Sequence, residues 1–374
     1  MVEWKKLGEV CAVHTGSQLN RDDMIEDGLY PVVNGGREVS GYTNSYNERG
    51  NSITISQGGE SAGYVNWIIT DFWAGAHCYV VEHKDIINRR YLYHVLKNKE
   101  RDIQQSKQGA GIPGLNKNTL YKQDIPIFPL AEQTRIVGIL DTFTSAIDNL
   151  KEQIAQRRKQ YEYYRDQLLD LEGKPGVEMK TLGEVIISLK TGLNPRKNFI
   201  LNEVGSNKPY ITGKDIFANR INVTDKTDMI NEIAVKLINR RACLESGLLL
   251  FASTGTGTVG RMAIIEQYNN DWAMSETLYA IKTKENLSSK YLMYFLYSEN
   301  AKKQFEPKIS KGSVPHLKVV DLLNVVIPIP HLSEQQRIVS ILDTFEASIQ
   351  NLEAQLKERE KQYEYYRNNL LKLE

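Results

Sequence analysis

The chain has 374 residues, a hydrophobic content of 41% and a formal net charge of +1. This length allows two domains of ordinary size, each with its own core. The mean hydropathy is −0.43, no apolar run reaches the length of a bilayer span, and Met1 is not followed by an apolar leader, so we expect a cytoplasmic protein.

Residues 1–129 have the pattern of a mixed α/β globule. A β-rich stretch punctuated by glycine covers 53–59, and a tyrosine-rich helical stretch covers 90–96. A loop that ends in Ile112-Pro113 follows, and the proline-rich segment 125–129 then runs up to the next element. Because proline disfavours helix in the residue before it, this segment should be extended.

Residues 130–172 recur as residues 332–374, at a constant offset of 202 positions and with 27 identities in 43. Apolar residues in each copy are spaced alternately by four and three. This heptad pattern predicts two helices of about 40 residues, each roughly 60 Å long. A narrow apolar seam needs a partner helix, and the simplest partner for each copy is the other one. We favour an antiparallel pair, because it places the two globular regions at opposite ends.

The predicted seam has one irregular position in each copy, where an arginine occupies an apolar slot. A buried polar seam residue can fix the register of two helices at some cost in stability. Alternatively, the arginine stem covers the seam while its head reaches water. The residues assigned to the seam are Phe143, Ile147, Leu150, Ile154 and Arg157 in the first copy and Phe345, Ile349, Leu352, Leu356 and Arg359 in the second.

Residues 173–331 repeat the plan of residues 1–129. Leu7-Gly8-Glu9-Val10 returns as Leu182-Gly183-Glu184-Val185, and a glycine-rich stretch at 249–260 precedes a tyrosine-rich one at 290–296. Only this region is basic, with a net charge of +6, which indicates an anionic partner or an ordinary solvated surface equally well.

The predicted fold class is therefore α+β, with a pseudo-twofold internal repeat. Two mixed α/β domains alternate with two long helices that pair as an antiparallel coiled coil. The first domain is expected at 1–129 and the central helix at 130–172. The second domain follows at 173–331, with 173–177 as a linker, and the C-terminal helix is expected at 332–374.

Signals for an enzyme are weak. The glycine-rich segment 255–260 could present backbone amides to a phosphate, but no Gly-Lys-Ser/Thr follows it. Asn194-Pro195-Arg196 is the nearest approach to the Asn/Asp-Pro-Pro-Tyr/Phe signature of DNA adenine methyltransferases. The histidines lack metal-ligand spacing. We therefore expect no catalytic residues, no metal and no cofactor on this chain.

The three cysteines, Cys11, Cys78 and Cys243, are far apart and form no Cys-x-x-Cys pair. Their spacing fits a reducing compartment and argues against a disulfide framework or a zinc ribbon. We expect all three to be buried as small apolar side chains.

The sequence resembles the specificity subunit of type I restriction-modification systems. The resemblance rests on the duplicated Glu-Gln-x-Arg-Ile-Val…Leu-Asp-x-Phe helix starts and on the Leu-Gly-Glu-Val entry of both halves. It implies a non-catalytic subunit with two target recognition domains, each of which reads one half of a split DNA sequence. It also implies two methyltransferase subunits that use S-adenosylmethionine, and it leaves room for two restriction subunits that use ATP and Mg.

Base edges and phosphates would be contacted by polar residues in the glycine-rich and proline-preceding loops. For each candidate the alternative is an ordinary exposed turn residue, and for Tyr64, Tyr91 and Tyr291 it is a place in the core. The candidates are Asn34, Arg37, Gln57, Ser61, Tyr64, Lys107, Gln108, Asn116 and Lys117 in the first domain and Lys214, Thr254, Thr256, Arg261, Lys308, Lys311, Ser313 and His316 in the second.

A rival from another class is a structural adaptor, in which the helices join two protein-binding domains that never touch nucleic acid. The near-neutral net charge favours this rival, since many DNA-binding proteins are more basic. Salt distinguishes the two, because a DNA reader loses affinity steeply as salt rises through counterion release.

Overall fold

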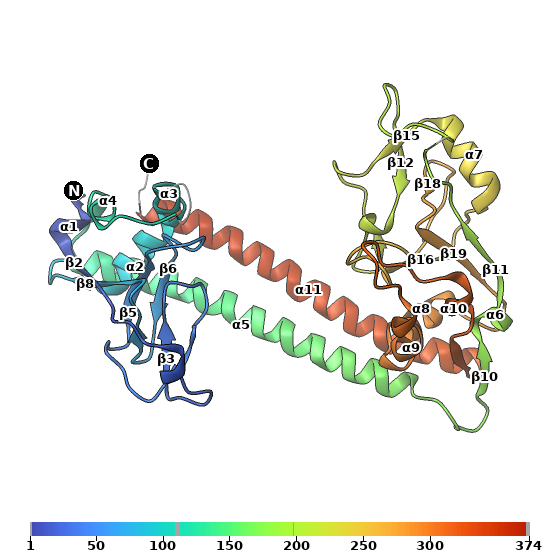
Figure 1. Cartoon of the computed structure of the whole chain (residues 1–374), viewed down its shortest axis with the longest axis horizontal. Coiled ribbons are helices and arrows are strands. Elements are labelled where there is room, and N and C mark those ends of the chain that lie inside the picture. The colour runs from blue at the N-terminus through green and yellow to red at the C-terminus, as the bar shows by residue number, and fades with distance from the viewer. Residues whose placement is uncertain (1, 109–112, 197, 372–374) are drawn as a thin grey trace. The chain divides into compact units, whose positions relative to one another are not determined.

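The computed structural model describes residues 2–108, 113–196 and 198–371 (Figure 1). The chain forms two compact units: unit 1 comprises Met1–Glu152 with Glu353–Glu374, and unit 2 comprises Gln153–Leu352. Both units mix helices with sheets, and two long helices run through them, which confirms the predicted fold class at this level. The last three residues of the second long repeat, and residues 109–112 of the loop before Pro113, lie outside the described part.

Unit 1 is built on a four-stranded antiparallel sheet, a three-stranded sheet and a two-stranded ribbon. The four-stranded sheet has the order β2 (Cys11–Thr15), β8 (Cys78–His83), β5 (Ser52–Ser56), β6 (Val65–Ile68). The three-stranded sheet has the order β4 (Gly41–Thr43), β3 (Tyr30–Val33), β7 (Trp73–Ala74), and the ribbon pairs β1 (Glu3–Lys6) with β9 (Asp124–Ile127). The short helices are α1 (Leu7–Val10), η1 (Arg21–Asp23), α2 (Arg89–Asn98), α3 (Glu100–Gln105) and α4 (Lys117–Tyr121).

Unit 2 repeats this plan. Its four-stranded sheet has the order β11 (Ile186–Thr191), β19 (Leu278–Thr283), β16 (Leu249–Ala252), β17 (Met262–Ile264). The other pairings are β15 (Met229–Ile230), β12 (Lys208–Ile211), β18 (Ala273–Met274) in one sheet, the ribbon β10 (Glu178–Thr181) with β20 (Val326–Ile329), and the hairpin β13 (Ile216–Phe217) with β14 (Arg220–Ile221). The short helices are α6 (Leu182–Val185), η2 (Gly213–Asp215), α7 (Glu232–Ala242), α8 (Ser289–Tyr297), α9 (Glu299–Phe305), η3 (Glu306–Lys308) and α10 (Val319–Leu323).

The two units differ in what is added to the common plan. In unit 1 helix α2 packs against β5 and β6, and in unit 2 helix α8 packs in the same way against β16 and β17. Unit 2 also contains α7 and the β13–β14 hairpin, for which the described residues of unit 1 show no counterpart. The second domain is therefore the first plan with an insertion beside its main sheet.

The long helices α5 (Leu130–Leu169) and α11 (Leu332–Leu371) have 40 residues each. Each unit buries the start of one and the end of the other. In unit 1, Leu140 and Leu371 belong to the same hydrophobic core. In unit 2, Leu342 and Leu169 take the equivalent places. Burial at both ends explains why the apolar pattern extends over the whole repeat.

Within each unit the two helices also touch through aromatic rings. Phe143 stacks on Tyr366 in unit 1, with ring centroids 5.2 Å apart, and Tyr164 stacks on Phe345 in unit 2 at 5.5 Å. The guanidinium of Arg359 lies over the Phe143 ring at 5.7 Å, and that of Arg157 lies over the Phe345 ring at 5.9 Å. The arginines of the predicted seam thus place their heads on the phenylalanine of the other helix, a favourable cation–π contact.

The other predicted seam residues differ in burial. Ile147 and Ile154 are buried. The remaining ones, which are half-buried, are Leu150, Ile349, Leu352 and Leu356.

The repeated Glu-Gln-x-Arg motif has a structural role. The side chain of Gln133 is fully buried, accepts from the backbone N–H of Asn88 at 2.7 Å and donates to the carbonyl of Phe128 at 2.7 Å. Gln335 does the same with Ser288 at 2.9 Å and Pro330 at 3.0 Å. Each glutamine therefore ties the start of a long helix to its globule.

Two cysteines are buried as expected, Cys11 and Cys78, but Cys243 is exposed, so that expectation was wrong for one residue. Cys243 follows α7 in the left-handed conformation, with φ of 49°, and ends the helix. Its role in capping leaves the side chain outside the core. Among the described residues no helix is long and apolar enough to cross a membrane.

Candidate nucleic-acid interface

In unit 1, backbone hydrogen bonds hold two of the predicted loops together. The N–H of Leu115 donates to the carbonyl of Gln57 at 2.7 Å, and the N–H of Gly59 donates to the carbonyl of Pro113 at 2.9 Å. The buried hydroxyl of Tyr79 donates to the carbonyl of Leu115 at 3.0 Å. The loop that follows β5 and the loop that precedes α4 therefore form one surface.

A third segment joins this surface through His77. The backbone N–H of His77 donates to Oδ1 of Asn34 at 3.3 Å, and the carbonyl of His77 accepts from the N–H of Gln57 at 2.9 Å.

Two cationic side chains lie near the ring of Tyr64. The guanidinium of Arg37 lies 5.8 Å from the Tyr64 ring, and Nζ of Lys97 lies 4.2 Å from it. Burial and the charge of Glu100 raise the pKa of Tyr64, so its hydroxyl stays a hydrogen-bond donor.

The remaining candidates of unit 1 have local roles that also fit ordinary loop residues. Nζ of Lys107 donates to the carbonyl of Glu60 at 3.0 Å, and Gln108 pairs with Gly114 in an isolated bridge. Asn116 caps α4, a common place for asparagine. The two others are half-buried beside these residues, Ser61 and Lys117.

Unit 2 joins its two equivalent loops in the same way, through different residues. We call this arrangement of two loops bridged by backbone hydrogen bonds the loop frame. The N–H of Leu317 donates to the carbonyl of Ser253 at 2.8 Å, and the N–H of Gly255 donates to the carbonyl of Pro315 at 3.0 Å. Tyr279 supplies the hydroxyl, which donates to the carbonyl of Leu317 at 2.8 Å. The frame is thus shared by both units, and the side chains it presents differ.

On this frame Thr254 and His316 lie side by side. Oγ1 of Thr254 is 2.7 Å from Nδ1 of His316, which leaves Nε2 of the imidazole available for another partner. The exposed candidates of this unit are Lys214, Thr256, Lys308, Lys311 and Ser313.

Arg261 links this surface to an element that the sequence did not predict. Its Nη1 donates to the carbonyl of Ile216 in the β13–β14 hairpin at 3.2 Å. The preceding Gly213 sits so close to the glycine-rich loop that an added Cβ would lie 3.1 Å from Cβ of Thr258. The hairpin therefore borders the surface and adds the exposed Phe217 and Arg220 to it.

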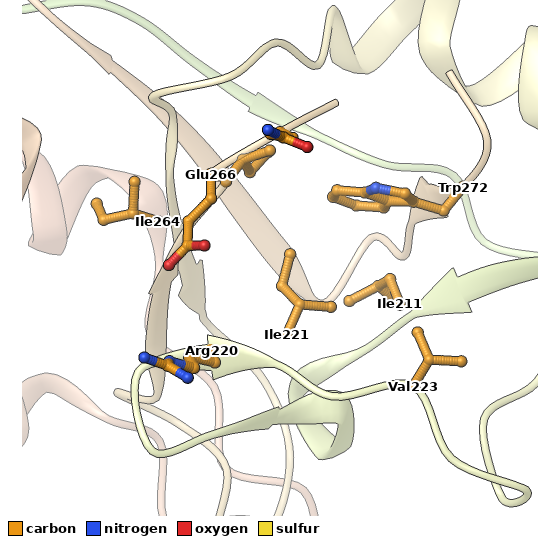
Figure 2. A pocket seen from close by; sticks show the side chains of 9 residues that line it. Ile211, Arg220, Ile221, Val223, Ile264, Glu266 and Trp272 are labelled. Atoms are coloured by element: carbon orange, nitrogen blue, oxygen red, sulfur yellow. The ribbon is translucent and has the colours of Figure 1, made fainter. Parts of the chain in front are cut away.

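A cavity of about 480 Å³ lies beside this hairpin (Figure 2). Figure 2 shows Arg220 and Glu266 on one side, Trp272 on the other and Ile221 between them. Its lining combines apolar side chains such as Ile211 and Ile221 with Arg220, Glu266 and Gln267, and it holds no grouping of nucleophile and base. Within residues 2–108, 113–196 and 198–371, no three His, Cys, Asp or Glu side chains could hold a metal ion.

Two tyrosines singled out in the sequence are core residues. Tyr91 and Tyr291 are fully buried, and their hydroxyls donate to the carbonyls of Pro126 and Pro328, each at 2.8 Å. These bonds fasten the proline-rich approach to the helix that covers the sheet.

Comparison with known proteins agrees with this architecture. Residues 1–157 and 175–360 match the family described as type I restriction modification DNA specificity domain. The Escherichia coli type I restriction enzyme EcoR124I/EcoR124II specificity subunit is 30% identical, over 99% of this chain and 94% of its own. The Haemophilus influenzae chain S.HindORF215P is also 30% identical, over 99% and 95%. The crystal structure of the type I restriction-modification S subunit from M. genitalium matches with a TM-score of 0.68 and 18% identity, over 99% of this chain and 96% of that one, which shows a common fold.

The chain therefore belongs to the type I restriction-modification DNA specificity family. Its role is that of a specificity subunit, which recognises DNA sequence. These findings do not favour the adaptor.

Proposed function

We propose that this chain reads a bipartite DNA target, with one half recognised by each globular domain. The observation that carries this proposal is the loop frame common to both units, Gln57 with Leu115 in one and Ser253 with Leu317 in the other. A fixed frame that presents different side chains is what two readers of different sequences require.

Sequence would be read by the polar side chains on each frame, at base edges in the grooves. Asn34 and Gln57 suit adenine in unit 1, and Arg261 suits guanine in unit 2. The lysines that fringe the second frame, Lys308 and Lys311, suit phosphates, which give affinity and register.

The helices α5 and α11 would form an antiparallel coiled coil that sets the distance between the half-sites. The ring contacts within each unit, Phe143 with Tyr366 and Tyr164 with Phe345, support this pairing. A rigid rod lets two readers engage one duplex only at a fixed separation and helical phase. The domains would then be 1–129 and 173–331, and the helical segments 130–172 and 332–374.

The same repeat supports docking of two methyltransferase subunits. Tyr163 on α5 and Tyr365 on α11 occupy matching positions and are 63% and 65% exposed, so each copy of a partner would meet an equivalent aromatic surface. In this proposal the chain acts in the cytoplasm and is itself non-catalytic. S-adenosylmethionine belongs to the methyltransferases, and ATP and Mg belong to any restriction subunits. Light scattering of the co-purified complex should give two methyltransferases per chain, and a ratio of one contradicts this stoichiometry.

DNA binding by the complex tests the function itself. Affinity for duplexes that carry both half-sites should fall linearly on a logarithmic scale as salt rises. Scrambling either half should cost affinity, whereas changing the spacer bases without changing their number should not. Binding without sequence preference at any salt concentration contradicts the proposal.

A further inference from the structure

The β13–β14 hairpin turns through two residues in the left-handed region of backbone conformation. Phe217 pairs with Arg220, and between them Ala218 and Asn219 have φ of 49° and 60°. This is the turn geometry that twisted hairpins prefer, and glycine or asparagine normally fills it. Alanine in the left-handed region is disfavoured because its Cβ approaches the next carbonyl. The turn therefore depends on contacts that hold it.

One of these contacts comes from the long helix α11. Nδ2 of Asn219 donates to Oε1 of Glu346 at 2.6 Å. The same oxygen is 3.3 Å from the hydroxyl of Tyr161 on α5, which donates to it. Inside the hairpin, Nδ2 of Asn222 donates to the carbonyls of Phe217 and Arg220 at 2.9 and 3.0 Å. The turn is thus stabilised by hydrogen bonds within the hairpin and by one hydrogen bond to the long helix α11.

Glu346 is an unusual residue for this position on the helix. It is half-buried beside a cavity of about 150 Å³ that also contacts the hairpin turn and Lys290, and burial raises its pKa. A carboxylate removed from water must be compensated by hydrogen bonds. At the matching position of the first repeat stands Thr144, whose hydroxyl donates to the carbonyl of Asp141 on its own helix at 3.1 Å. The carboxylate is therefore specific to unit 2, as is the hairpin.

The far side of the hairpin meets the candidate DNA interface. The carbonyl of Ile216 accepts from Arg261, and η2, which carries Lys214, packs on the glycine-rich loop through Gly213. A continuous set of contacts therefore runs from Glu346 through Asn219 and the hairpin to Arg261. If Asn219 is released, the carbonyl that orients the guanidinium of Arg261 is free to shift.

We propose that Glu346 is a positioning residue for the second half of the DNA target, acting through the β13–β14 hairpin on Arg261. This inference rests on the proposed function. Because Thr144 replaces the carboxylate in the first repeat, the long helix positions the reader in this way only in unit 2. The hairpin belongs to the proposed reading surface of that unit, and its anchor, Glu346, is on the long helix α11.

The test uses the full chain in complex with its methyltransferase subunits and fluorescent duplexes that carry the motif methylated in the source strain. Each duplex has one base changed, in either the first or the second half. Glu346→Thr introduces the residue of the first repeat and should reduce discrimination in the second half by about 10-fold or more, with the first half unchanged. Glu346→Gln keeps an oxygen acceptor for Asn219 and Tyr161 and should behave like the wild type.

A second variant removes the contact from the other side. Asn219→Gly suits the positive φ of the turn, leaves Glu346 in place and should show the same selective loss as Glu346→Thr. Thr144→Ala in the first repeat is the matched control and should leave discrimination in both halves intact. Thermal unfolding of each variant monitors the fold.

The outcomes separate the inference from the function on which it rests. Equal loss in both halves, or unchanged discrimination in Glu346→Thr and Asn219→Gly, overturns the positioning role while the wild type still reads its motif. A wild-type complex without sequence preference overturns the proposed function and the inference with it.

Discussion

The junctions between each globule and its long helix keep the same positions but use different chemistry. In unit 1, Oδ1 of Asp141 lies 2.8 Å from Nε of Arg90 and 2.8 Å from Nε2 of His94. In unit 2, Asp343 meets Nζ of Lys290 at 2.8 Å and the hydroxyl of Tyr294 at 2.6 Å. The repeat therefore fixes a carboxylate and leaves its partners free to vary in type.

A second pair of sites shows the same rule at the sheet. In unit 1, the side chain of Glu100 accepts from the N–H of Val65 at 2.8 Å, and Nζ of Lys97 donates to the carbonyl of Val65 at 2.9 Å. In unit 2 a single hydroxyl, that of Tyr297, takes the place of these two side chains and accepts from the N–H of Met262 at 2.9 Å. Hydrogen-bond positions are preserved between the halves, although the residues that fill them are not. The halves can therefore diverge in charge without changing their frame.

The largest expected effect comes from lengthening both long helices equally. Insertion of seven residues at matched points preserves the heptad pattern and adds about 10.5 Å, or roughly three base pairs. Methylation at the original motif should disappear, and both half-sites should return with a longer spacer. Methylome sequencing measures the length of the spacer. An unchanged spacer means that the long helices do not set the distance between the half-sites.

Replacing either buried glutamine should destabilise only its own unit. Gln133→Leu leaves the N–H of Asn88 and the carbonyl of Phe128 without a partner, at a cost of about 3 kcal/mol. Gln335→Leu should cost about the same at the equivalent site of unit 2. Hydrogen exchange measured by mass spectrometry reports each unit separately. Loss of protection in both units from one substitution contradicts this independence.

Substitution of one arginine in each reader should affect opposite halves of the target. Arg261→Ala should lower affinity for the correct second half by about 10- to 100-fold and leave the first-half preference intact. Arg37→Ala is the reciprocal change in unit 1. Titration of duplexes altered in a single half gives both preferences. Equal loss in the two halves from either variant contradicts independent readers.

The smallest expected effect is a pH response confined to unit 1. Burial lowers the pKa of His94 more than its bond to Asp141 raises it, and its Nδ1 has no hydrogen-bond partner among the described residues. The unfolded histidine takes up a proton as pH falls through its ordinary value of about 6.5, whereas the folded one stays neutral to lower pH. Unit 1 should therefore lose stability as the pH falls from 7 to 5.

Tyr294 occupies the equivalent place in unit 2, and burial raises its pKa, so it stays neutral throughout this range. His94→Tyr is thus the natural control, and it should remove the pH dependence of unit 1. Hydrogen exchange at pH 5 and pH 7 measures the response. The same acid sensitivity in both units rules out His94 as its source.

Structure could be predicted from the sequence where a repeated apolar pattern extends over many residues. Two helices of 40 residues follow from apolar spacing alone, because a heptad repeat leaves few other structures. Prediction failed for short features. The β13–β14 hairpin has two residues in each strand and turns at Ala218-Asn219, which carries no glycine or proline signal.

The arrangement of the candidate site was also hidden in the sequence. Thr254 and His316 are separated by 62 residues, and their contact depends on how two loops are bridged. The candidate DNA-contacting residues lie mostly in loops, and loops lack the periodicity that identifies helices. Cys243 was misjudged for a similar reason, because a helix cap depends on one local backbone conformation.

The most direct test of the central claim is a genome-wide map of N6-methyladenine in the source organism with and without this gene. We predict the loss of one motif made of two short fixed halves around an unspecified spacer of constant length. Identical maps from cells in which the complex is expressed and the methyltransferase is active contradict the assignment of this chain as the reader of that motif.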